Sequence, residues 1–120
     1  MKLNEKVGLG TVQFGLPYGI SNKAGQTDSI EVTKILKTAK TYKIQVLDSA
    51  SAYGNSEDVL GQNDLSSFKM VSKFMPDSME DISNQLETSL EKLGIQKLHG
   101  YLAHRPLNIL ENPAQWDKLL

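Results

Sequence analysis

Four side chains with the chemistry of a proton-transfer site lie at or just beyond the ends of predicted strands: Asp48, Tyr53, Lys73 and His104. A tyrosine is a weak acid at neutral pH, because its ordinary pKa is about 10. An ammonium beside the phenol favours the phenolate, and a carboxylate would hold that ammonium charged and oriented. A neutral histidine could donate a hydrogen bond to a carbonyl group. Together these groups could protonate a carbonyl oxygen while a hydride reaches its carbon, and general acid catalysis of this kind contributes about 10²–10⁴-fold in rate.

Each of these residues also has an ordinary structural explanation. Asp48 could cap a turn, and the Lys73 side chain could extend from a strand end into solvent. Tyr53 could pack as a loop aromatic, and His104 could be a turn residue before Arg105. Each explanation is plausible alone, but four such residues at successive strand ends favour one common site.

Short apolar segments supply the strands that would position this site. We expect strands over residues 7–12, 44–47, 68–73 and 98–103. Helical patterns lie between and after them. The first is predicted over 28–43 with Asp28 as its cap. A short one is predicted over 57–60, capped by Asn55 or Ser56 and ended by Gly61. The remaining two are predicted over 78–94, with Ser78 as cap, and from Asn112-Pro113 onward. One apolar stripe is expected to pack the third helix into the core: Met79, Ile82, Leu86, Leu90 and Leu93.

This alternation of strands and helices predicts an α/β fold with parallel strands and helices packed over the sheet. In such folds the carboxyl ends of the strands share one edge. We therefore expect Asp48, Tyr53, Lys73 and His104 to converge. His99, inside the fourth predicted strand, is expected to have a structural role.

Composition excludes several classes of function. Thirteen basic and fourteen acidic residues give a net charge of −1, which argues against a nucleic-acid binder. The absence of cysteine excludes disulfides, thiol catalysis and cysteine-ligated zinc, and we expect no metal site. Neither a signal-peptide apolar run nor a membrane-length apolar window occurs. We expect a cytoplasmic protein without membrane contact.

At the residues of the candidate site the chain resembles the amino-terminal half of an aldo-keto reductase. The resemblance runs from residue 7 to about residue 106. It is carried by Leu-Gly-Thr-Val-Gln-Phe-Gly at 9–15, Leu-Asp-Ser-Ala at 47–50, Tyr-Gly-Asn-Ser-Glu at 53–57, Leu-Gly at 60–61, Val-Ser-Lys at 71–73 and Tyr-Leu-Ala-His-Arg-Pro at 101–106.

The resemblance implies a (β/α)₈ barrel that reduces aldehydes and ketones with NADPH. Tyr53 would be the proton donor, Lys73 and Asp48 would tune it, and His104 would orient the carbonyl. The cofactor would meet Gly10, Thr11 and Asp48. Residues 13–20 resemble bacterial members associated with surface-polysaccharide genes, which favours a sugar-like carbonyl substrate.

Some positions depart from the family pattern. Val12 stands where many members have tryptophan, and His99 where many have aspartate. A complete barrel needs about 200 residues or more, so residues 1–120 are expected to form a partial domain containing strands one to four. Most of the NADPH site would lie beyond residue 120, and we expect the chain alone to be inactive.

Two alternatives remain open: a non-catalytic remnant that binds a partner, and a half-barrel that closes by dimerising. Open sheet edges are expected near residues 7–12 and 98–103, and such edges favour self-association. The inward-facing candidates on these strands are Leu9, Val46, Met70 or Val71, and Leu102.

Overall fold

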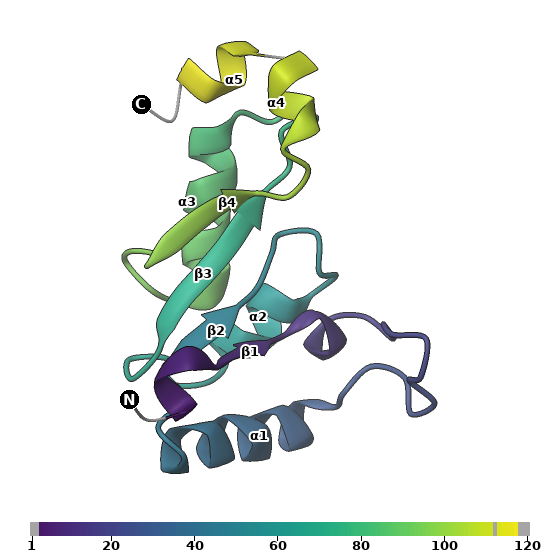
Figure 1. Ribbon diagram of the computed structural model, residues 1–120, viewed down its shortest axis with the longest axis vertical. Helices are drawn as coiled ribbons and strands as arrows, with labels where there is room; N and C mark the ends of the chain where they lie inside the picture. The colour runs from purple at the N-terminus through teal and green to yellow at the C-terminus, as the bar shows by residue number, and fades with distance from the viewer. Residues whose placement is uncertain (1–2, 112, 118–120) are drawn as a thin grey trace.

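The computed structural model describes residues 3–111 and 113–117 (Figure 1). Four parallel strands form one sheet in the order β1-β2-β3-β4. They are β1 (Gly8–Gly10), β2 (Val46–Asp48), β3 (Lys69–Phe74) and β4 (Gly100–Ala103). The helices between them are α1 (Ser29–Thr41), α2 (Ser56–Gly61) and α3 (Ile82–Leu93). The predicted parallel arrangement of strand–helix units is confirmed.

Short helical segments complete the described chain. A 3₁₀ helix, η1 (Leu3–Lys6), precedes β1, and a second, η2 (Val12–Phe14), follows it. After β4 come α4 (Leu107–Glu111), which was not predicted, and α5 (Pro113–Asp117). The predicted start of the last helix at Pro113 is confirmed, whereas its predicted cap, Asn112, lies outside the described residues. None of the helices described is both long and apolar enough to cross a membrane.

Aspartate side chains cap the first turns of α1 and α3. The Asp28 carboxylate accepts a hydrogen bond from the Glu31 backbone N–H at 2.8 Å, so α1 begins as predicted. The predicted Ser78 cap is wrong. Asp81 caps α3 by accepting from the Asn84 N–H at 3.1 Å.

The later start of α3 changes the face that it buries. Met79 lies outside the helix and is fully exposed, so its predicted place in the core is wrong. The buried positions of α3 are Ile82, Gln85, Ser89 and Leu93. Two of them are polar, and both form hydrogen bonds inside the protein.

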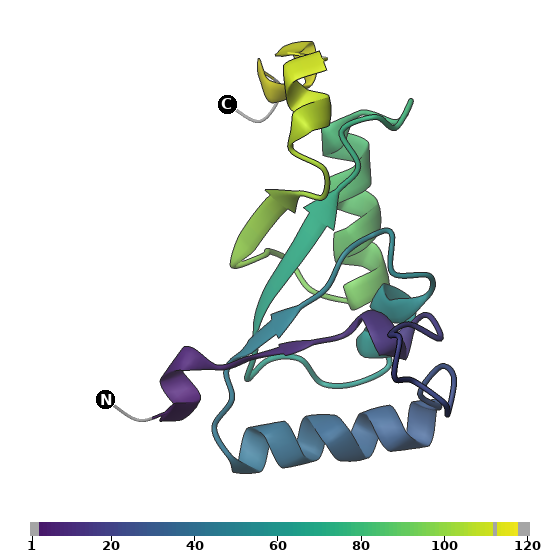
Figure 2. The same ribbon diagram turned by 45° about the vertical axis from the view of Figure 1, so that its right-hand side comes forward.

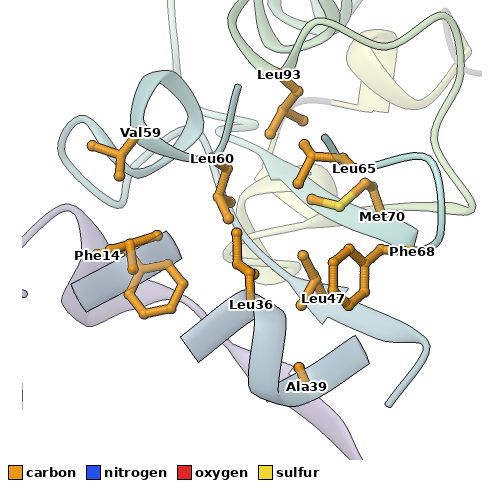
Figure 3. Close-up of a cluster of buried hydrophobic side chains, with 11 residues drawn as sticks. Phe14, Leu36, Ala39, Leu47, Val59, Leu60, Leu65, Phe68, Met70 and Leu93 are labelled. Atoms are coloured by element: carbon orange, nitrogen blue, oxygen red, sulfur yellow. The ribbon is translucent and has the colours of Figure 1, made fainter. Parts of the chain in front are cut away.

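One face of the sheet packs against α1, α2 and α3. Leu47 and Met70, which are paired neighbours on β2 and β3, are buried there against Leu36 of α1 and Leu60 of α2 (Figure 3). Leu9 packs against the same cluster. Leu9 therefore faces the helices, contrary to its predicted inward position. Of the two alternatives predicted for the third strand, Met70 faces the helices and Val71 lies on the opposite face. β1 and β2 contain three residues each. An alternating pattern this short does not indicate from the sequence which side chains face the helices.

The opposite face carries the alternating residues of the same strands. In the described part of the chain no element covers this face (Figures 1 and 2). Val46, Val71 and Leu102 lie on it, as predicted, and Leu102 keeps 49% of its surface exposed. Lys73 also lies on this face, at the carboxyl end of β3, where the site begins.

Candidate active site

The Lys73 ammonium is the centre of the candidate site. Its Nζ donates hydrogen bonds to Asp48 Oδ1 at 2.9 Å, to the Ser49 carbonyl at 2.9 Å and to the Tyr53 hydroxyl at 3.1 Å. An ammonium has three protons to donate, so these bonds use all of them. The predicted convergence of Asp48, Tyr53 and Lys73 is confirmed by these distances.

Two opposing effects set the pKa of Lys73. Burial favours the neutral amine and lowers this pKa, while the hydrogen bonds with Tyr53 and Asp48 and their negative charge raise it. The second effect prevails, and the Lys73 pKa lies above its ordinary value. Lys73 therefore stays charged throughout the neutral range. The side chain of Lys73 is 15% exposed and that of Asp48 is 43% exposed, so the carboxylate is the more accessible partner.

His104 joins this group through its contact with Tyr53. The two rings meet edge to face, with centroids 5.9 Å apart. The His104 backbone N–H donates to the Phe74 carbonyl at 2.9 Å, which fixes the histidine at the end of β3 and β4. Its Nδ1 is buried and meets no hydrogen-bond partner in the part of the chain that the structure describes. All four predicted residues are therefore brought to one end of the sheet.

A cavity of about 250 Å³ adjoins Tyr53 and His104. Its remaining wall comes from η2 and the loops around it, through Val12, Leu16, Tyr18 and Ala52. A tryptophan at position 12 would occupy much more of this space than Val12 does. A small ligand in this cavity would lie next to the Tyr53 and His104 rings.

Hydroxyl groups of Thr11, Ser51 and Ser56 support the backbone of the site through hydrogen bonds. The sequence analysis did not identify this role. Thr11 Oγ1 donates to the Asp48 carbonyl at 3.0 Å, and Ser56 Oγ donates to the Thr11 carbonyl at 3.0 Å. Ser51 Oγ donates to the Lys73 carbonyl at 3.0 Å. The sequence signal, a loop rich in serine, does not distinguish such a network from an ordinary turn. Thr11 is completely buried and offers no surface to a ligand, so its place in the site is that of a positioning residue.

Two glycines fix the loop that carries Tyr53. A Cβ added to Gly15 would lie 1.8 Å from the Tyr53 carbonyl oxygen and 2.5 Å from the Ser56 nitrogen. Gly54 has a φ of +55°, which disfavours any other residue, and its Cβ would meet the Gly15 carbonyl oxygen at 2.3 Å. The backbone after η2 therefore packs directly against the Tyr53 loop, and neither position has room for a side chain.

The sequence model of the aldo/keto reductase family matches residues 6–119. The chain belongs to this family. The match includes the four residues that converge here, Asp48, Tyr53, Lys73 and His104.

Two solved structures from Pseudomonas aeruginosa, each assigned as an aldo-keto reductase, are similar to this aldo-keto reductase chain. The first is 31% identical with a TM-score of 0.76, and the match covers 93% of this chain and 48% of that one. The second is 30% identical with a TM-score of 0.73, and covers 93% and 47%. No curated protein matches the chain significantly.

The chain thus spans about half the length of these solved aldo-keto reductases. Its four parallel strands and their helices are the first half of a (β/α)₈ barrel, as expected from the sequence. In such barrels the active site lies at the carboxyl ends of the strands. The Lys73 cluster occupies that end of this sheet.

Proposed function

We propose that this chain carries the proton-donating part of an NADPH-dependent reductase of aldehydes or ketones, which acts once the barrel is complete. The observation that carries the proposal is the Lys73 ammonium, which contacts the Tyr53 hydroxyl at 3.1 Å and the Asp48 carboxylate at 2.9 Å. A charged lysine at this distance stabilises the phenolate that remains after a proton leaves Tyr53.

Each of the four residues has a defined part in this reaction. Tyr53 gives its hydroxyl proton to the carbonyl oxygen, and Lys73 stabilises the resulting phenolate until water restores the proton. Asp48 keeps the Lys73 side chain in place. His104 donates a hydrogen bond to the carbonyl oxygen through Nε2, because its Nδ1 is buried. Both donors therefore stabilise the same oxygen, where negative charge develops.

The residues present are compatible with a nicotinamide at this end of the sheet. Gly10 is exposed, it is paired with Asp48, and no atom lies within 4 Å of the place that its Cβ would take. This free space beside an accessible carboxylate suits a flat ring, so Gly10 and Asp48 are the residues that would hold it. When bound, the nicotinamide would supply the hydride to the carbonyl carbon. The choice of NADPH over NADH follows the family resemblance.

The substrate is proposed to enter the cavity beside Tyr53 and His104. Its volume of about 250 Å³ suits a small carbonyl compound, and Tyr18 at its wall offers a ring and a hydroxyl group. The sugar-like substrate and the cytoplasmic location stay predictions of the sequence.

The substitution Tyr53→Phe tests the proposal in a barrel completed with its second half. We expect carbonyl reduction to fall by about 10²–10⁴-fold, since the acid is removed. NADPH affinity, followed by fluorescence titration, should change little, because the hydroxyl acts on the substrate. Tyr101→Phe is the matched control, since the Tyr101 hydroxyl lies on the helix-facing side and has no partner among the described residues. Equal losses of binding and turnover in Tyr53→Phe would contradict the assigned role.

A second candidate is a non-catalytic half-barrel that binds a partner. The uncovered face of the sheet and the exposed Leu102 favour it. The same experiment distinguishes the two candidates. A binding module would retain its partner in Tyr53→Phe and show no carbonyl reduction in any form.

A further inference from the structure

We propose that Glu57 is a positioning residue for the proton transfer, which acts through Ser72 to hold Lys73 at hydrogen-bond distance from the Tyr53 hydroxyl. The inference rests on the proposed function, because it assigns a further residue to the same site. It gives a role to a buried carboxylate that the proton transfer itself does not use.

Glu57 is a carboxylate in the interior without a cation beside it. It is 3% exposed, and no basic side chain lies within ion-pair distance of it in the described part of the chain. One of its oxygens accepts a hydrogen bond from Ser72 Oγ at 3.1 Å, and the other accepts one from Ser89 Oγ at 3.0 Å. Both serines are buried. Burial of a carboxylate is costly, and two neutral donors offset only part of that cost.

A gain in stability does not explain this buried group. When all members of a buried polar cluster are replaced by apolar groups of similar shape, the free energy of unfolding can stay nearly unchanged or rise. What the carboxylate adds is direction, because a hydrogen bond requires a defined distance and angle, whereas apolar contacts are non-directional. The site that needs such direction is the one on the other face of β3.

The hydrogen bond between Glu57 and Ser72 joins the two segments that form the reactive contact. Glu57 lies in the first turn of α2, directly after the Tyr53 loop, and the Ser56 N–H donates to the Tyr53 carbonyl at 3.0 Å. Ser72 directly precedes Lys73 on β3. Successive side chains of a strand point to opposite faces, so Ser72 reaches Glu57 while Lys73 reaches Tyr53. The bond therefore fixes the Tyr53 segment relative to the strand that carries the lysine.

Other contacts hold the same strand and would survive the loss of Glu57. The Ser51 Oγ donates to the Lys73 carbonyl at 3.0 Å, and β3 stays paired with β2 and β4. Removal of the Glu57 bond should therefore displace the Lys73 side chain without unfolding the sheet. A displacement of about 1 Å can reduce a rate by about 10²-fold.

The test uses the barrel completed with its second half. Glu57→Leu combined with Ser72→Ala and Ser89→Ala removes the three polar groups together, so that none is left unpaired. We expect kcat to fall by about 10²-fold in this triple variant, while NADPH affinity and the urea midpoint stay near those of the unsubstituted barrel. Glu57→Gln is the conservative control. It should keep most of kcat, because a carboxamide can accept from one serine hydroxyl and donate to the other.

Nitrogen-15 NMR of the Lys73 ammonium gives a measurement that needs no turnover. Its three hydrogen bonds should slow the exchange of its protons with water and give a resonance that Lys73→Met removes. We expect this resonance to be lost or broadened in the triple variant and retained in Glu57→Gln. Ser72→Ala alone deletes one hydroxyl and should show the same two losses, which keeps the test available if the triple variant does not fold.

The outcomes separate this inference from the proposed function. An unchanged kcat or an unchanged Lys73 resonance in the triple variant and in Ser72→Ala would overturn the positioning role. Equal losses in Glu57→Gln and the triple variant would also overturn it, because the hydrogen bonds would then not be what matters. A completed barrel that reduces no carbonyl compound, but whose Lys73 resonance depends on Glu57, would contradict the proposed function and still support the positioning of Lys73.

Discussion

Lys73 is the residue on which the candidate site depends. It contacts a carboxylate, a backbone carbonyl and a phenol at once, at distances between 2.9 and 3.1 Å. Its Nζ also lies 4.8 Å from the centre of the Tyr53 ring. Because its pKa is raised, Lys73 does not titrate in the neutral range. A pH dependence of the reaction near neutrality would therefore have to come from another group.

Lys73→Met in the completed barrel should reduce turnover about as severely as Tyr53→Phe. The methionine keeps the length of the side chain but leaves the Tyr53 phenolate and the Asp48 carboxylate without their cation. Steady-state rates from pH 6 to pH 10 would measure the loss. Lys37→Met, at an exposed position on α1, is the control. Turnover of Lys73→Met near the unchanged level would contradict the role of the ammonium.

Tyr101 shows the opposite situation, a polar group without a partner. Its hydroxyl is buried and forms no hydrogen bond within the described chain. Burial, followed by the charges of Glu57 and Glu80, raises the pKa of Tyr101 well above its ordinary value. The fold thus favours the neutral phenol. The contribution of this group to stability is complete below the ordinary tyrosine pKa of about 10 and is lost as the pH rises beyond it.

Tyr101→Phe is expected to stabilise the chain. Removal of an unpaired buried hydroxyl should gain up to about 1 kcal/mol in the free energy of unfolding at pH 7. The difference from the unsubstituted chain should grow above about pH 10, where only tyrosine can ionise on unfolding. Urea denaturation of the barrel completed with its second half, at pH 7 and pH 10.5, would measure both values. Tyr18→Phe, at an exposed hydroxyl, should show neither effect, and a destabilised Tyr101→Phe would indicate a partner for the hydroxyl.

At the scale of elements, α2 connects the site to the rest of the fold. Glu57, in its first turn, is almost completely buried. Its carboxylate accepts hydrogen bonds from Ser72 Oγ at 3.1 Å and from Ser89 Oγ at 3.0 Å. Ser72 precedes Lys73 on β3, and Ser89 lies on α3. Glu57 therefore links α2 to β3, the strand that carries Lys73, and to α3.

The contact between the η2 loop and the Tyr53 loop yields a paired prediction. Gly15→Ala should destabilise the chain by about 3 kcal/mol or more, because its Cβ overlaps the Tyr53 backbone. Gly10→Ala should leave the free energy of unfolding nearly unchanged, since its Cβ enters free space. Urea denaturation of both variants in the completed barrel would show the difference. Tolerance of Gly15→Ala would mean that the loops lie farther apart than described.

The elements differ in how far the sequence predicts them. The alternating strands and helices and the Asp28 cap were predictable, because period and capping chemistry are local. The start of α3 was not, because Ser78 and Asp81 both suit a cap and both accept a hydrogen bond from a nearby backbone N–H, Ser78 from Glu80 and Asp81 from Asn84. The four site residues were predictable from strand ends. The hydroxyl of Thr11 was not recognised as a support, because its partners lie far along the chain.

At the scale of the whole fold, the described residues form a half-barrel whose two sheet faces differ in how fully they are covered. The helix-facing side has a packed core, in which the buried Glu57 carboxylate is paired with Ser72 and Ser89. The inward side holds the site residues but lacks the opposing half of the barrel. We predict that the chain alone self-associates through its open edges, and that its NADPH affinity is far below that of a complete reductase. Proton donation and cofactor binding are thus proposed to reside largely in different halves.

The most direct test of this account is NADPH oxidation with an aldehyde substrate, measured for the chain alone, for the complementary half alone and for the co-expressed pair. We predict activity in the pair only, and its loss in the pair that carries Tyr53→Phe. Reduction of the aldehyde by a monodisperse 13.3 kDa monomer of the chain alone, or activity in the pair that survives Tyr53→Phe, would contradict the account.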